Sequence, residues 1–113
     1  MHRVSWVLLF AAGGFEVVWA LALKRSDGFA HLGPTVVFVI ALALSMVLLA
    51  FAMRDLPLGT AYAVWTGTGA VGAALAGIAL LGESATPGRL LAIAMVAGGI
   101  VWLALGESGQ ARA

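Results

Sequence analysis

The stretch VSWVLLFAAGGFEVVWALAL, residues 4–23, holds twenty residues of which only Glu16 has an ionisable side chain. A helix rises about 1.5 Å per residue, so this stretch is long enough to cross a membrane hydrocarbon core of about 30 Å. Glu16 then lies well inside the core, where an ionised side chain costs at least about 2.5–3.5 kcal/mol on insertion scales. Intramembrane carboxylates usually have a function, so Glu16 is the first candidate for a binding site.

The composition of the whole chain also indicates a membrane protein. Of its 113 residues, 63% are hydrophobic and 10% are charged, whereas a soluble domain has about 25% charged residues. The chain has no cysteine, and His2 and His31 fall in polar connecting regions without metal-ligand spacing. A net charge of +1 gives no basic footprint for nucleic acid. We therefore expect no enzyme, no catalytic residues, no metal, no cofactor and no nucleic-acid partner.

Polar and proline-containing segments divide the chain into four apolar spans. Pro34, Pro57 and Pro87 all fall where a span starts, and proline suits the first turn of a helix because its missing N–H is not needed there. Spans of this length without alternation are helices and not barrel strands. We predict a single all-α domain with membrane spans at about 4–23, 34–53, 57–81 and 87–105, followed by a short, disordered polar tail, 106–113.

The short connections make neighbouring helices antiparallel and leave a small bundle that encloses little space, so a substrate cavity would need a second copy. The basic residues balance: Arg3, Arg54 and Arg112 fall on one side of the membrane, and Lys24, Arg25 and Arg89 on the other. The positive-inside rule then sets no orientation. We expect a dual-topology chain that pairs with an inverted copy as an antiparallel homodimer. Chance balance of short loops is the alternative.

Other polar and small residues surround Glu16 in the predicted helices. Gly13, one turn before it, leaves open space beside the carboxylate, and Trp19, one turn after it, offers an indole N–H. Ser45 lies halfway along the second span. A serine that bonds only its own helix, or a glutamate that only fixes packing, is the structural alternative.

The third span carries GTAYAVWTGTGAVG, residues 59–72. Tyr62 and Trp65 share a helix face and form an aromatic wall with a hydroxyl and an N–H, although Tyr62 also suits an interfacial aromatic belt. Gly67 and Gly69 favour either close helix packing or a kink. In the fourth span, Ala94 and Gly98 make a small-xxx-small pair that suits helix packing between two copies.

These parts meet the minimum requirement for exchange of a cation against protons. Burial disfavours a charged carboxylate, and either a proton or a bound cation neutralises it. The two ligands therefore compete for the same group. The GTGAVG segment is not a phosphate-binding loop, because it lies inside a membrane span without a preceding soluble strand.

GGFEVVWALALKRSDGF (13–29), the central Ser45 and LPLGTAYAVWTGTGAVG (56–72) together resemble the small multidrug resistance family, and more narrowly its guanidinium-exporter subtype. The resemblance covers nearly the whole chain. Exporter members have a tryptophan three residues after the glutamate, here Trp19, where multidrug members usually have a glycine. One departure is the end of the fourth helix, where exporters usually have a GLK-like sequence and this chain has WLAL (102–105), so that Ala104 replaces the basic residue.

The resemblance implies an antiparallel homodimer in the bacterial inner membrane, in which both Glu16 residues bind guanidinium or protons. It implies that Gly13, Trp19, Ser45, Tyr62 and Trp65 line the site. Trp19 and Ser45 would orient the Glu16 carboxylates by hydrogen bonding, and Tyr62 would order that network. The segment from Gly67 to Gly69 matches the family's helix kink.

Three functions follow from these observations. The first is a proton-coupled antiporter that exports guanidinium and small guanidinyl cations. The second is a broad multidrug exporter of quaternary ammonium and lipophilic cations. The third is a non-transporting membrane subunit, or half of a heteromeric exporter, in which Glu16 pairs with a partner. Guanidinium is favoured because its paired N–H donors match the two oxygens of a carboxylate.

Overall fold

The computed structural model describes residues 2–110, and the side chains of residues 3–106. This part of the chain forms four α-helices: α1 (His2–Arg25), α2 (Leu32–Ala52), α3 (Leu58–Leu81) and α4 (Pro87–Gln110). Each helix holds a span long and apolar enough to cross a membrane, and in α4 this span is Pro87–Gly106. The prediction of an all-α, multi-pass membrane protein with four spans is confirmed.

The helices start at the prolines, as the sequence indicates. Pro57 is the N-cap of α3, Pro87 is the first residue of α4, and Pro34 is the third residue of α2. Thr86 adds a side-chain cap to α4, because its Oγ1 accepts the backbone N–H of Arg89 at 3.2 Å.

The end of α4 differs in length from the expected span. The helix continues to Gln110, five residues into the stretch expected as a polar tail. Residues 111–113, the rest of that stretch, lie outside the described part of the chain.

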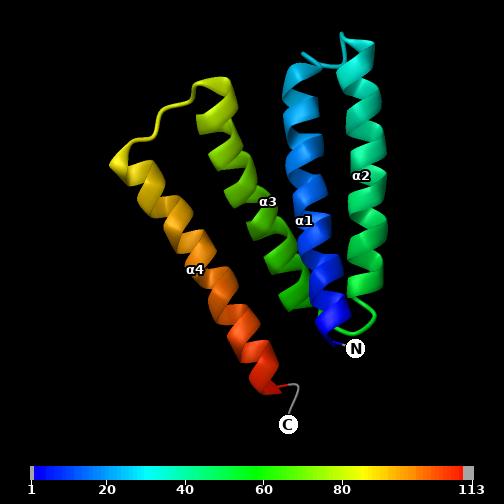
Figure 1. Ribbon diagram of the computed structural model, residues 1–113, viewed down its shortest axis with the longest axis vertical. Helices are drawn as coiled ribbons and strands as arrows, with labels where there is room; N and C mark the ends of the chain where they lie inside the picture. The colour runs from blue at the N-terminus through cyan, green and yellow to red at the C-terminus, as the bar shows by residue number, and fades with distance from the viewer. Residues whose placement is uncertain (1, 111–113) are drawn as a thin grey trace.

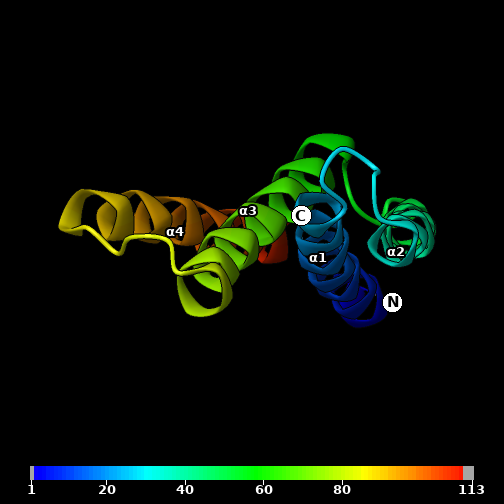
Figure 2. The same cartoon turned by 90° about the horizontal axis from the view of Figure 1, so that it is seen from above.

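The four helices lie in an open row, in the order α2, α1, α3, α4 (Figures 1 and 2). The molecule measures 50 × 34 × 17 Å, so it is little more than one helix thick along its shortest axis. α1 packs against both α2 and α3, whereas α4 contacts α3 and, among the described residues, neither of the other two helices. This arrangement is more open than the small bundle expected from the sequence.

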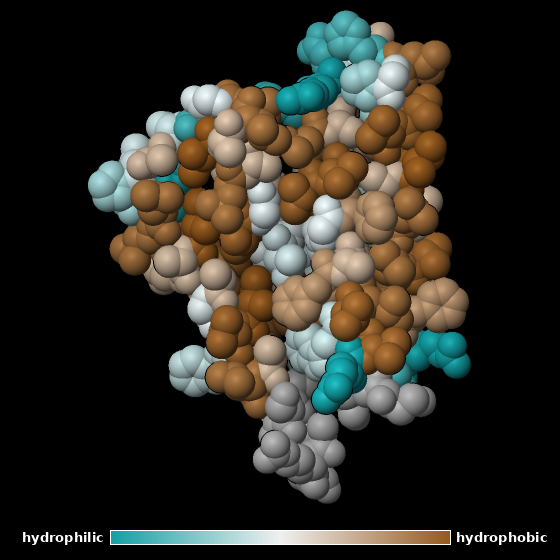
Figure 3. Space-filling view, in the orientation of Figure 1, coloured by the Kyte–Doolittle hydropathy of each residue, from teal (hydrophilic) through white to brown (hydrophobic). Residues whose placement is uncertain are grey.

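The buried core lies where α1, α2 and α3 meet. It consists of Leu9, Ala12, Leu49, Ala52, Leu56, Ala61, Val64 and Trp65. No residue of α4 is buried among those whose side chains are described. On the face shown in Figure 3, apolar residues cover most of the surface, and hydrophilic ones gather near the ends of the helices. A membrane would cover this apolar surface with lipid tails.

α1 and α3 run in one direction and α2 and α4 in the other (Figure 1). Along the direction of the helix axes, Arg3 and Arg54 therefore belong to one end of the molecule, and Lys24, Arg25 and Arg89 to the opposite end. This is the division expected for these five basic residues. The sixth, Arg112, lies outside the described residues.

Candidate functional site

Glu16 lies in the middle of α1, on the face that packs against α3. Its Oε1 atom is buried and has no hydrogen-bond partner among the described residues. The carboxyl group lies directly against Gly69 of α3, where an added Cβ would overlap it. A glycine is therefore needed at position 69 for Glu16 to occupy this place.

Two further close contacts continue this pattern along α1 and α3. Gly13 lies against the side chain of Thr68, and Gly72 lies against Val17. In each contact a glycine of one helix receives a side chain of the other, which lets the two backbones approach closely. Paler residues appear among apolar ones where α1 meets α3 in Figure 3.

The space at Gly13 differs from what the sequence suggests. It was expected to be open beside the carboxylate, but the Thr68 side chain fills it: an added Cβ at Gly13 would lie 2.6 Å from Thr68 Cγ2. The sequence alone cannot show this, because the pairing of residues between two helices depends on their relative position along the axis.

Ser45 and Trp65 form a hydrogen-bonded chain that joins three helices. Trp65 Nε1 donates to Ser45 Oγ at 2.9 Å, and Ser45 Oγ donates to the backbone carbonyl of Ala12 at 2.7 Å. Ser45 is fully buried and Trp65 nearly so. The chain holds the turn of α1 that precedes Glu16. The hydroxyl of Ser45 thus donates its hydrogen bond to the carbonyl of Ala12, whereas the family resemblance implies a hydrogen bond to Glu16.

Trp19 lies one turn after Glu16 on α1. Its ring packs edge-on against Phe38 of α2, with ring centres 5.9 Å apart. Its Nε1 atom is buried without a partner among the described residues, so the indole N–H remains available as a donor.

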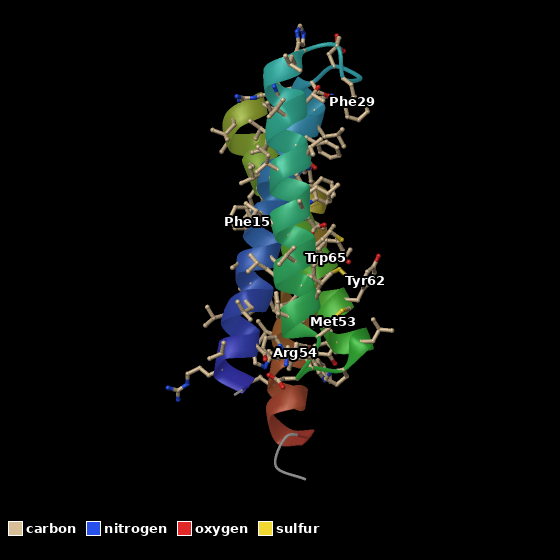
Figure 4. The ribbon with its side chains drawn as sticks, turned by 90° about the vertical axis from the view of Figure 1, so that its right-hand side faces the viewer. Phe15, Phe29, Met53, Arg54, Tyr62 and Trp65 are labelled. Atoms are coloured by element: carbon tan, nitrogen blue, oxygen red, sulfur yellow. The ribbon has the colours of Figure 1, made fainter. Side chains whose placement is uncertain are left out.

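Tyr62 lies at the outer edge of the site. Its ring centre is 5.5 Å from that of Trp65, which places the two predicted aromatic residues together. Trp65 lies against α2, whereas Tyr62 projects away from the helices and is 53% exposed (Figure 4). The side chain of Tyr62 therefore points out of the single chain.

Three buried polar atoms lack a hydrogen-bond partner within the described part of the chain: Glu16 Oε1, Trp19 Nε1 and Thr68 Oγ1. Leaving such a group unpaired in a dry environment is unfavourable. Glu16 and Trp19 are predicted from the sequence as site residues, whereas Thr68 is not. A signal was present, because Thr68 follows Trp65 by three residues and therefore shares its helix face.

The other predicted positions lie on α3 and α4. Gly67 contacts the side chains of Val96 and Ile100 on α4, whereas Gly69 contacts the side chain of Glu16 on α1. The two glycines therefore allow close packing of α3 against two different helices. α3 is helical at both glycines. Ala94 and Gly98 are exposed, and an added Cβ at Gly98 would meet open space, with no described atom beyond its own stretch of helix within 4 Å. The pair is therefore not used for packing within the chain.

No group of three or more histidine, cysteine, aspartate or glutamate side chains capable of holding a metal occurs among the described residues. The chemistry available at the site is that of one carboxylate with nearby hydroxyl and indole groups. Such a set binds a cation that has hydrogen-bond donors, or a proton.

Known proteins resemble this chain over most of its length. The family model of the small multidrug resistance protein matches residues 4–96. A guanidinium exporter of Escherichia coli is 58% identical over 102 residues, and guanidinium exporters of Salmonella typhimurium and Citrobacter freundii are 54% identical over the same length. Each comparison covers 90% of this chain and 97% of the relative. The chain therefore belongs to the small multidrug resistance family.

Proposed function

We propose that this protein is a secondary active transporter that exports guanidinium and small guanidinyl cations in exchange for protons. The observation that carries the proposal is Glu16, a carboxylate in the middle of a membrane span with one buried oxygen that has no partner among the described residues. Relatives at 54–58% identity that are named guanidinium exporters support the choice of cation.

Guanidinium suits this carboxylate because it is planar and offers paired N–H donors to two carboxylate oxygens. The unpaired Nε1 of Trp19 supplies an additional donor that would hold the carboxylate while it binds the cation. A quaternary ammonium ion has no N–H to donate, so the same site would bind it less well.

Exchange follows from competition for Glu16. Either a proton or a guanidinium ion neutralises the carboxylate. A negatively charged carboxylate with neither ligand bound is unfavourable at this depth in the membrane. A proton taken up from outside would displace guanidinium outward, and guanidinium from inside would displace the proton inward. Transport then needs no cofactor, because the proton gradient across the bacterial inner membrane drives it.

The functional unit in this proposal is an antiparallel homodimer. The single chain is an open row whose α4 has no buried residue among its described side chains, and the pair Ala94 and Gly98 is free to pack against a second copy. Balanced basic residues at the two ends permit both orientations in the membrane. An opposed copy would cover the exposed half of Tyr62 and bring a second Glu16 into the site.

The glycines of α3 give this dimer a place to bend. Gly67 contacts α4 and Gly69 contacts α1, so bending between them would move the two sides of the row relative to each other. Two opposed copies with different bends would open the site to one side of the membrane, and exchanging the bends between the copies would open it to the other side.

The test is to reconstitute the purified chain in liposomes and to record currents on a solid-supported membrane when guanidinium is added. We expect currents with the native protein, none with Glu16→Gln, and weaker ones with a quaternary ammonium ion. Equal currents with the quaternary ion would favour the multidrug function. No current from a folded native protein would contradict the proposal and favour a heteromeric or non-transporting role.

A further inference from the structure

Thr68 is the unassigned polar residue of the α1–α3 contact. Its methyl group packs against Gly13: an added Cβ there would be 2.6 Å from Thr68 Cγ2 but 3.8 Å from Thr68 Oγ1. Packing between the helices therefore uses the methyl carbon and does not need the hydroxyl. A valine of the same shape would fill the space equally well.

The hydroxyl of Thr68 is nevertheless buried and unpaired. A threonine inside a helix usually bonds a carbonyl three or four residues earlier, which satisfies its hydroxyl locally. Here Oγ1 has no partner among the described residues. A buried hydroxyl without a partner is less favourable than a methyl group in the same place. The hydroxyl thus lowers the stability of the single chain without contributing to its packing.

The position of Thr68 places this hydroxyl beside the carboxylate site. The next residue, Gly69, contacts the Glu16 carboxyl group, and the glycine that Thr68 itself contacts lies one helical turn before Glu16. Thr68 and Glu16 therefore occupy adjacent places along the same helix contact, and each has a buried oxygen without a partner in the part of the chain that the structure describes.

We propose that Thr68 is a further cation-binding residue, whose Oγ1 accepts an N–H from the guanidinium ion held by Glu16. This inference rests on the proposed function. Guanidinium has more N–H donors than one carboxylate can accept, and a hydroxyl oxygen has two lone pairs. The hydroxyl pairs with the cation when the site is loaded and discriminates against cations that have no N–H to donate.

The experiment measures guanidinium binding to the full chain by isothermal titration calorimetry in lipid nanodiscs. Thr68→Val keeps the shape and removes the hydroxyl, and Thr68→Ser keeps the hydroxyl. Thr66→Val is the matched control, because Thr66 is an exposed threonine on the same helix. We expect Thr68→Val to weaken binding about tenfold, and Thr68→Ser and Thr66→Val to change it less than about twofold.

A second readout separates a role in binding from a role in structure. Proton binding to the empty site, followed by tryptophan fluorescence as the pH is changed, should be the same in Thr68→Val and native protein if the hydroxyl contacts only the cation. If Thr68→Val does not yield folded protein, Thr68→Ala replaces it, since alanine removes the hydroxyl and leaves the space at Gly13 unfilled.

The outcomes are distinguishable. If the native chain binds guanidinium and Thr68→Val binds it equally well, the role of Thr68 is wrong and the proposed function stands. Equal weakening by Thr68→Val and Thr68→Ser also overturns it, because the loss would then follow any change at position 68 and not removal of the hydroxyl. If the native chain binds no guanidinium, both the proposed function and the role of Thr68 are overturned.

Discussion

Trp65 Nε1 donates a hydrogen bond to Ser45 Oγ at 2.9 Å, and this bond joins two helices, α2 and α3, that otherwise touch very little. Ser45 passes the link to the carbonyl of Ala12 on α1. In hydrocarbon the alternative to such a bond is an unsatisfied polar group. The link therefore fixes the position of α2 relative to the part of α1 that carries Glu16.

The Ser45–Trp65 pair should be energetically coupled. Ser45→Ala and Trp65→Phe should each lower the unfolding free energy in mixed micelles by about 1–2 kcal/mol, because each removes one side of a buried hydrogen bond. The double variant should lose less than the sum of the two. Additive losses in this double-mutant cycle would show that the bond contributes little.

Gly69→Ala should disrupt the site without removing any functional group. An added Cβ at position 69 overlaps the Glu16 carboxyl group, so the carboxylate must move or the helices must separate. We expect guanidinium affinity to fall by about tenfold or more, measured by calorimetry.

The control for this change is Gly59→Ala. Gly59 belongs to the same helix, and an added Cβ there would meet open space, with no described atom beyond its own stretch of helix within 4 Å. This variant should bind like the native chain. If both variants bind normally, the close approach of Gly69 to Glu16 does not matter for binding.

Guanidinium binding should depend on pH through Glu16. A proton and the cation compete for one carboxylate, so the apparent affinity should fall as the pH is lowered, by up to about tenfold per pH unit once the protonated form predominates. It should level off at high pH, where no proton competes. Calorimetric titrations at several pH values check this, and Glu16→Gln should show no binding at any of them. Affinity that rises as the pH falls would contradict direct competition.

Most of the fold could be predicted from the sequence, because a few simple features determine where the helices lie. The polar segments after the first three spans and the prolines at Pro34, Pro57 and Pro87 punctuate apolar stretches of membrane length. The arrangement of the helices in an open row could not be predicted from the sequence. Lipid tails and the protein interior are equally apolar, so residues that face lipid and residues that face another helix are of the same types.

The site was readable only in part, for a related reason. Glu16 and Trp19 stand out as polar groups within apolar stretches, and Tyr62 and Trp65 as an aromatic pair. Thr68 shares a helix face with Trp65, but this signal alone is weak, since small residues, threonine included, are common where membrane helices pack. Its importance depends on its contact with Gly13 and its missing hydrogen bond, and neither is encoded in local sequence.

The uncovered face of α4 should hold the two copies together. Gly98 has open space around it in the single chain, so Gly98→Leu should leave the fold of one copy unchanged. In the dimer the larger side chain should prevent close approach of two α4 helices. Cross-linking in liposomes should then show mostly monomer, and guanidinium currents should fall at least tenfold. Ala43→Leu, a small-to-large change at an exposed position of α2, is the control and should remain dimeric. A Gly98→Leu variant that cross-links as a dimer and transports normally would place the contact between copies elsewhere.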